Sequence, residues 1–106
     1  MLTSADSALL GELAQKLRAE FPEARVWAFG SRARGDATVD SDFDVCIALP
    51  QVDETIRKQI RYIAWETGFD HGELFNTMIL SSDEMEHGPM SKSSIVANIK
   101  RDRIAA

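Results

Sequence analysis

The chain has 106 residues, 44% of them hydrophobic and 27% charged, and this profile predicts one domain, residues 1–106, with a core of its own. Its formal net charge of −5 argues against broad nucleic-acid binding, which relies on many Lys or Arg contacts to phosphate. Cys46 is the single cysteine, and neither a secretory leader nor a run of about 18 apolar residues is present, so we expect a cytoplasmic protein without a disulfide or a membrane span.

The first quarter of the chain predicts a helix and then a strand. Apolar residues at helical spacing follow Thr3 and Ser4, either of which can cap a helix over about 4–20 that Pro22 ends. The short apolar run Val26–Phe29 predicts a buried strand. The polar stretch 31–41 is then expected to form a loop, or a short helix followed by a loop.

The segment Phe43–Leu49 returns to strand character. Its odd-numbered residues are apolar and share one face, whereas Asp44 and Cys46 lie on the other. A stripe of isoleucines then predicts a second amphipathic helix over about 53–67, and Gly68 is expected to end it.

The last third of the chain predicts one more strand and two helical segments. The strand is expected over about 73–80, and a turn of helix through Glu86 follows, capped by Ser81 or Ser82. The tail 91–104 predicts a final helix. This order of elements indicates an α/β (α+β) fold, a small three-stranded mixed sheet backed on one face by helices.

The residues with chemical potential lie between the first two strands. Gly30 directly follows a strand and lets the backbone approach a ligand closely, and a helix that opens at Ser31 would offer N–H groups and a hydroxyl to phosphate. Asp42 and Asp44 are two apart on a strand, so both carboxylates leave the same face and can converge on a divalent cation. Mg²⁺ prefers one or two carboxylates together with water and phosphate oxygens. The segment therefore predicts a site for a Mg²⁺-nucleotide.

The pattern Gly30-Ser31-x-Ala33-Arg34-Gly35, followed after five residues by Ser41-Asp42-x-Asp44, resembles the signature of the DNA polymerase β-like nucleotidyltransferase superfamily. The short chain is similar in size to the minimal nucleotidyltransferase (MNT) branch of that superfamily. The resemblance implies the polymerase β-like fold, with Gly30 and Ser31 at the nucleotide phosphates and Asp42 and Asp44 on Mg²⁺. It also implies that Arg34 either supports the loop or reaches phosphate.

Proteins of this superfamily usually complete the metal site with a third carboxylate on a later strand, and this group can act as general base. Glu73, at the start of the third predicted strand, is our prediction for this catalytic role, and Asp70 in the preceding loop is the alternative. The strand itself contains Asn76 but no aspartate. If neither carboxylate reaches the metal, the protein binds Mg²⁺-nucleotide but transfers slowly or not at all.

The resemblance implies Mg²⁺-dependent transfer of a nucleoside monophosphate, AMP from ATP, to a hydroxyl group. Minimal nucleotidyltransferases often pair with a helical HEPN-type ribonuclease as antitoxin to toxin and can modify a tyrosine of that toxin. We therefore expect a nucleotide and a HEPN-type protein as partners, in a homo- or hetero-oligomer. The alternative is a binding module that neutralises its partner by covering it. Tyr62 and Trp65 are expected either in the core or on a partner-facing patch.

Overall fold

The computed structural model of the protein describes residues 1–38 and 41–106. The elements in chain order are α1 (Ser4–Glu20), β1 (Arg25–Phe29), α2 (Gly30–Arg34), β2 (Phe43–Leu49), α3 (Glu54–Phe69), β3 (Phe75–Ser81), α4 (Ser82–Glu86), the 3₁₀ helix η1 (Met90–Lys92), α5 (Ser94–Asp102) and β4 (Ile104–Ala105). The stretch 31–41 begins as a short helix, α2, which was one of its two expected forms. Residues 39–40 of that stretch lie outside the described residues.

The sheet is mixed and has four strands in the order β3-β2-β1-β4, one strand more than the sequence predicts. β2 runs parallel to β3 and antiparallel to β1, and β1 also pairs antiparallel with β4. The end of the expected helix over 91–104 is wrong, because α5 already ends at Asp102. Ile104 and Ala105 form β4 instead and pair with β1. The chain leaves the helix there and supplies hydrogen-bonding partners to the outer edge of β1.

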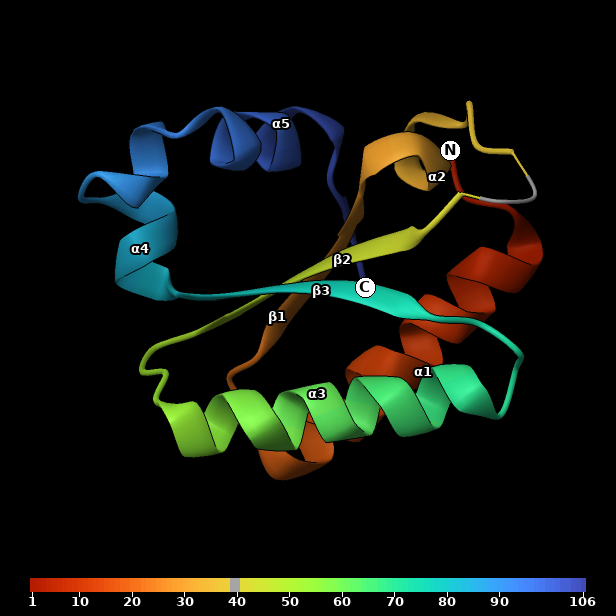
Figure 1. Ribbon diagram of the computed structural model, residues 1–106, viewed down its shortest axis with the longest axis horizontal. Helices are drawn as coiled ribbons and strands as arrows, with labels where there is room; N and C mark the ends of the chain where they lie inside the picture. Colours follow the sequence, from red (N-terminus) through yellow and green to blue (C-terminus); the bar gives the residue numbers. More distant parts are fainter. Residues whose placement is uncertain (39–40) are drawn as a thin grey trace.

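Helices cover both faces of the sheet, whereas the sequence analysis expected one covered face (Figure 1). α1 and α3 lie on one face, and α4 and α5 lie on the other. The first core lies between the sheet and helices α1 and α3, and Phe43 and Val45 of β2 belong to it. The second core lies between the sheet and helices α4 and α5, and Cys46 belongs to it. Because Cys46 and Ala48 make most of the second face of β2 apolar as well, each face needs a helical layer to exclude water. The short helices α4 and α5 provide the second layer with Met85 and Ile99, both fully buried.

Side-chain caps explain where the helices begin. The hydroxyl of Thr3 accepts a hydrogen bond of 3.0 Å from the backbone N–H of Asp6 at the start of α1. α4 begins with a capping box, in which Ser81 and Glu84 each accept from the other's backbone N–H. Asp53 caps α3 in the same way as Thr3 caps α1. For α1 and α4 the structure selects the first of the two caps that the sequence allows.

Gly68 lies inside α3 instead of ending it, because the helix continues through Phe69. The glycine is buried, and a Cβ atom built on it would lie 2.5 Å from the carbonyl oxygen of Glu73. The backbone N–H of Glu73 donates to the carbonyl of Gly68 at 2.9 Å. The missing side chain therefore lets the chain turn back tightly from α3 toward β3.

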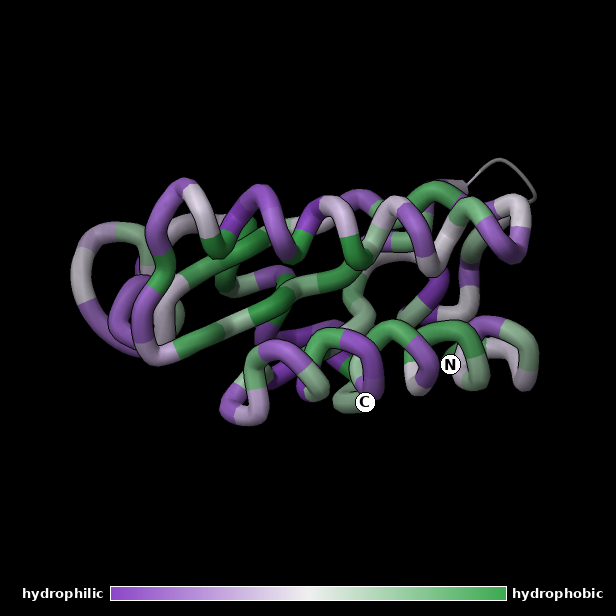
Figure 2. Tube along the Cα trace, turned by 90° about the horizontal axis from the view of Figure 1, so that it is seen from below, coloured by the Kyte–Doolittle hydropathy of each residue, from purple (hydrophilic) through white to green (hydrophobic). Residues whose placement is uncertain are grey.

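The hydropathy of the chain follows these layers. Figure 2 shows hydrophobic residues concentrated on the strands in the middle layer, while the helices alternate between hydrophobic and hydrophilic residues. This alternation is typical of helices that bury one face against a sheet. No helix among the described residues is long and apolar enough to cross a bilayer.

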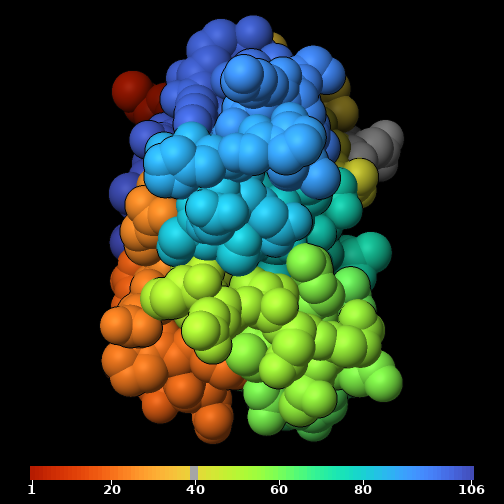
Figure 3. Space-filling view, turned by 90° about the vertical axis from the view of Figure 1, so that its left-hand side faces the viewer, coloured from red at the N-terminus to blue at the C-terminus, as the bar shows by residue number. Residues whose placement is uncertain are grey.

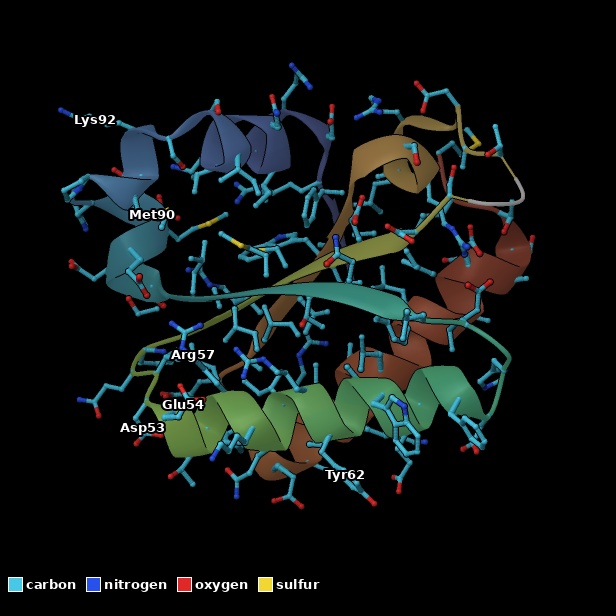
Figure 4. The ribbon with its side chains drawn as sticks, viewed as in Figure 1. Asp53, Glu54, Arg57, Tyr62, Met90 and Lys92 are labelled. Carbon is cyan, nitrogen blue, oxygen red and sulfur yellow. The ribbon has the colours of Figure 1, made fainter. Side chains whose placement is uncertain are left out.

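At one end of the molecule, α4 packs beside the beginning of α3 (Figure 3). Arg57 of α3 donates to the carbonyl oxygen of Ile79 in β3 at 2.9 Å and lies 3.9 Å from Glu84 of α4. Figure 4 shows Arg57 directed toward the strands and Tyr62 directed away from them. Arg57 therefore links α3 to the edge strand and to the helix that follows it.

The solvent side of α3 carries a row of aromatic residues. Tyr62, Trp65 and Phe69 are 60%, 53% and 68% exposed, and the rings of Trp65 and Phe69 stack with centroids 5.2 Å apart. Of the two expected locations for Tyr62 and Trp65, the structure shows the surface.

The contribution of the first core to stability is testable at Leu13 of α1, which has no exposed surface. We expect Leu13→Ala to lower the free energy of unfolding by about 2–5 kcal/mol, since it leaves a cavity under the sheet. A Cβ atom added at Gly11 of the same helix would meet no heavy atom within 4 Å. Gly11→Ala should therefore raise the free energy of unfolding by about 0.5–1 kcal/mol. Urea denaturation of both variants checks the pair, and equal effects would contradict this assignment of the core.

Candidate active site

An open cleft of about 370 Å³ lies where β1 ends and where β2 and β3 begin, with α5 on its other side. In Figure 1 this is the region between α2, α5 and the neighbouring ends of the strands. Its polar side chains are Arg34, Asp44, Asn76, Thr77, Asn98 and Asp102, and its apolar ones are Phe29, Met78 and Ile95. The backbone of Gly30 completes the lining. The cleft thus combines two carboxylates, two amides, a hydroxyl and an arginine with a small apolar wall.

Gly30 and Asp44 are in close contact at the bottom of this cleft. Gly30 has a φ of +76°, which favours glycine, and it stands opposite the start of β2 because Phe29 pairs with Asp44. A Cβ atom on Gly30 would overlap Oδ2 of Asp44 and lie 3.2 Å from its Cγ. The absence of a side chain at position 30 is therefore what gives the half-buried carboxylate of Asp44 its place.

Asn76, and not a carboxylate, is the neighbour of Asp44 on the adjacent strand. The two residues are register partners in the parallel pair of β2 and β3. The amide Nδ2 of Asn76 donates to Oδ1 of Asp44 at 2.9 Å. On the strand next to Asp44, where a third carboxylate was expected to complete the metal site, the chain thus has an amide group.

Asp42 and Ser31 flank the cleft without lining it. Asp42 is exposed and lies one residue before β2, and Ser31 is half-buried in the first turn of α2. Within residues 1–38 and 41–106, neither side chain has a hydrogen-bonding partner. Because Asp42 precedes β2, strand alternation fixes the side only of Asp44, and the convergence of the two carboxylates stays a prediction.

Glu73 and Asp70 lie away from the cleft lining. Both carboxylate oxygens of Glu73 accept from Arg32, at 3.1 and 3.0 Å. Asp70 is the exposed C-cap of α3. The structure therefore brings together Gly30, Arg34 and Asp44 of the predicted site, and it places Glu73 in an ion pair.

Arg34 joins α2 to α5 across one end of the cleft. Its guanidinium donates to Asp102 at 3.0 Å and to Asp36 at 3.3 Å. Hydrogen bonds from Arg101 and then from Arg34 lower the pKa of Asp102, and the hydrogen bond to Asp102 is the main cause that raises the pKa of Arg34. Asp102 is therefore an ionised anchor for Arg34.

The donors beside the cleft suit a hard divalent cation. Asp42 and Asp44 supply carboxylate oxygens, and Mg²⁺ typically takes one or two carboxylates while water and phosphate oxygens fill the remaining positions. Because Gly30 has no side chain, the carboxylate of Asp44 can lie against its backbone and face the open cleft. Among the described residues no group of three or more His, Cys, Asp or Glu side chains could hold a metal ion. The site therefore fits a metal ion that a bound phosphate helps to hold.

Cys46 does not contribute a nucleophile to this region. It is fully buried in the second core, and burial raises the pKa of its thiol to about 12. A thiol with such a pKa stays protonated and unreactive at neutral pH. Its place among apolar residues is that of a small core residue.

The architecture, a mixed sheet with helices on both faces and an acidic cleft at the ends of its strands, defines the class as an α+β domain with an open ligand cleft. The nucleotidyltransferase domain family model matches residues 10–104, so the chain belongs to that family. A solved structure described as a "putative nucleotidyltransferase" from Sulfolobus solfataricus is similar, with a TM-score of 0.54, 20% identity and coverage of 92% of this chain and 76% of that one. At this identity the similarity supports the fold. No curated protein gives a significant match.

Two residues at the site were not assigned roles by the sequence pattern. Asn76 contacts Asp44 only because strand register places the two residues side by side. Arg32 forms ion pairs with Asp6 and Glu73, which are distant from it in the sequence. The one signal available in the sequence was that the third strand contains an asparagine and no aspartate.

Proposed function

We propose that the protein is a Mg²⁺-dependent nucleotidyltransferase that transfers AMP from ATP to a hydroxyl group. The observation that carries the proposal is the open cleft of about 370 Å³ at the ends of the strands, since it is lined by the backbone of Gly30 and by the carboxylate of Asp44 and is large enough to admit a phosphate beside them. Membership of the nucleotidyltransferase domain family supports the same class of reaction. Mg²⁺ bound at Asp42 and Asp44 would neutralise charge that develops on the phosphates.

The residues of the cleft have distinct roles in this proposal. Gly30 and Ser31 lie at the phosphates, Arg34 borders them from α2, and the apolar wall with Ile95 offers a surface for the nucleoside. The acceptor oxygen forms a bond to the α-phosphorus, the bond from this phosphorus to the bridging oxygen breaks, and pyrophosphate leaves while the hydroxyl proton passes to solvent. Positioning and charge stabilisation supply most of the catalysis in such transfers.

Removal of both carboxylates tests the proposal. We expect Asp42→Asn/Asp44→Asn to lose Mg²⁺-dependent ATP binding by at least about 100-fold and to abolish transfer, because both charged ligands are gone. The measurement is calorimetric titration of ATP with and without Mg²⁺. It is combined with incubation of α-labelled ATP and a lysate of the source cells. Glu23→Gln/Asp83→Asn, at two exposed positions outside the cleft lining, is the matched control. Unchanged ATP binding by the Asp42/Asp44 variant would refute the metal site.

We further propose that the acceptor is a tyrosine hydroxyl of a HEPN-type protein, for which this chain acts as antitoxin. The motif from Gly30 to Asp44, which resembles the signature of the superfamily to which the minimal nucleotidyltransferases belong, supports this proposal. Label from α-labelled ATP should enter the HEPN-type protein and disappear when its acceptor tyrosine is replaced by phenylalanine. Label on RNA or on a small molecule instead would overturn the choice of acceptor.

A binding module that neutralises a partner without transfer is the second proposal. Asn76 favours it, because an amide stands beside Asp44 where a third carboxylate would complete the site. Retained partner neutralisation by the Asp42→Asn/Asp44→Asn variant would support this module. Loss of neutralisation with complex formation intact would support the enzyme.

A further inference from the structure

The guanidinium of Arg32 lies outside the cleft lining and is fully committed to other groups. Its side chain is 11% exposed and is absent from the cleft lining. Nε and Nη2 donate to the carbonyl oxygen of Ser41 at 3.3 and 2.8 Å, and Nη1 donates to Asp6 at 3.2 Å. Nη1 and Nη2 also donate to the two oxygens of Glu73 at 3.1 and 3.0 Å. These contacts use all the N–H groups that an arginine side chain possesses.

Two of these contacts enclose Asp42. The carbonyl that Arg32 binds belongs to the residue before Asp42, and the guanidinium lies 4.9 Å from the ring centroid of Phe43, the residue after it. Phe43 is fully buried, which anchors this side of the contact. Among the residues that the structure describes, the carboxylate of Asp42 has no hydrogen-bonding partner, so its position depends on the backbone that Arg32 holds.

Glu73 in turn holds Arg32. It forms a two-point ion pair with the guanidinium, a geometry that fixes the plane of the arginine as well as its distance. Its own backbone is anchored to Gly68 by a hydrogen bond of 2.9 Å. The hydrogen bond that Arg32 donates to Glu73 is also the largest cause that raises the pKa of Arg32, so the arginine is charged at every physiological pH.

We infer that Arg32 and Glu73 are a positioning pair, which holds the backbone on both sides of Asp42 so that its carboxylate can bind Mg²⁺ together with Asp44. This inference rests on the proposed function, and it gives Glu73 a role different from that of a general base. Glu73 acts through Arg32 and Ser41, and neither it nor Arg32 touches the nucleotide.

The test compares Glu73→Gln and Arg32→Lys with the control Glu12→Gln. Glu12 is a half-exposed carboxylate that pairs with Lys16 and His71, away from the cleft. Titration of Mg²⁺ at fixed ATP, followed by calorimetry, gives the Mg²⁺ concentration at half-saturation. We expect about a tenfold increase for both variants and none for the control, because partners that orient metal ligands typically contribute 10- to 100-fold in affinity.

A second measurement does not depend on nucleotide binding. Amide hydrogen exchange of Asp42 and Phe43, measured by NMR on the free protein, should be several-fold faster in Glu73→Gln than in Glu12→Gln. Unchanged exchange would overturn the positioning pair even if the wild-type protein binds no ATP, a result that would refute the proposed function separately. Loss of transfer by Glu73→Gln with an unchanged Mg²⁺ half-saturation would also overturn the pair and would instead identify Glu73 as the general base.

Discussion

Gly30→Ala is expected to reduce Mg²⁺-dependent ATP binding by about 100-fold or more while the protein still folds. The added methyl group overlaps Oδ2 of Asp44, and the carboxylate can move away only by breaking its hydrogen bond of 2.9 Å with Asn76. In addition, alanine at a φ of +76° costs about 1–2 kcal/mol of stability. The measurement is ATP titration in the presence of Mg²⁺, with thermal unfolding recorded alongside.

Gly72→Ala is the matched control for this variant. Gly72 has a φ of +67°, close to that of Gly30, but no heavy atom lies within 4 Å of the Cβ that would be added. Both variants should therefore lose stability through the backbone, and only Gly30→Ala should lose nucleotide binding. Equal ATP affinity in the two variants would show that the contact between Gly30 and Asp44 has no part in binding.

Asn76→Asp is expected to make the protein respond strongly to Mg²⁺. The new carboxylate would face Asp44 at the position from which Asn76 now donates at 2.9 Å, so a hydrogen bond is replaced by repulsion. Without metal we expect a loss of about 1–3 kcal/mol at neutral pH. With Mg²⁺ the loss should be reversed, and transfer to an acceptor should become faster than in the wild type.

The control for this gain is Asn98→Asp, which adds the same charge to the cleft from α5. Asn98 lines the cleft but is not a register partner of Asp44. Melting temperatures with and without Mg²⁺ distinguish the two variants. A Mg²⁺-induced increase of the same size in both would mean that general charge, and not a completed ligand set, is responsible.

Much of the fold could be predicted from local patterns. Alternation along β2 and helical spacing along α1 and α3 gave ranges close to the observed elements, because burial on one face imposes these periods directly on the sequence. Helical segments were also predicted where α4 and α5 lie, but their place on the second face of the sheet was missed, because local spacing does not say which face a helix covers. β4 was missed because it has only two residues, too few to show an alternating pattern in the sequence. These residues form a strand because the free edge of β1 offers them hydrogen-bonding partners.

The site shows the same division between local and distant information. Gly30 and Asp44 are placed by a short motif around two adjacent antiparallel strands, and the structure brings them into contact as the spacing suggests. Which residue of β3 lies beside Asp44 depends on the register of β2 and β3. These two strands are parallel, and the connection between them includes the whole of α3. A shift of one residue would have directed a different side chain toward Asp44.

The sequence by itself therefore determined the family, the main helices and strands, and the place of Gly30 and Asp44 at neighbouring strand ends. The tertiary structure alone decided that Asn76 stands beside Asp44 and that Glu73 is bound to Arg32. The physical reason is that a side chain's partners across the sheet are set by strand register and by the packing of distant segments, and neither leaves a periodic signal in the chain.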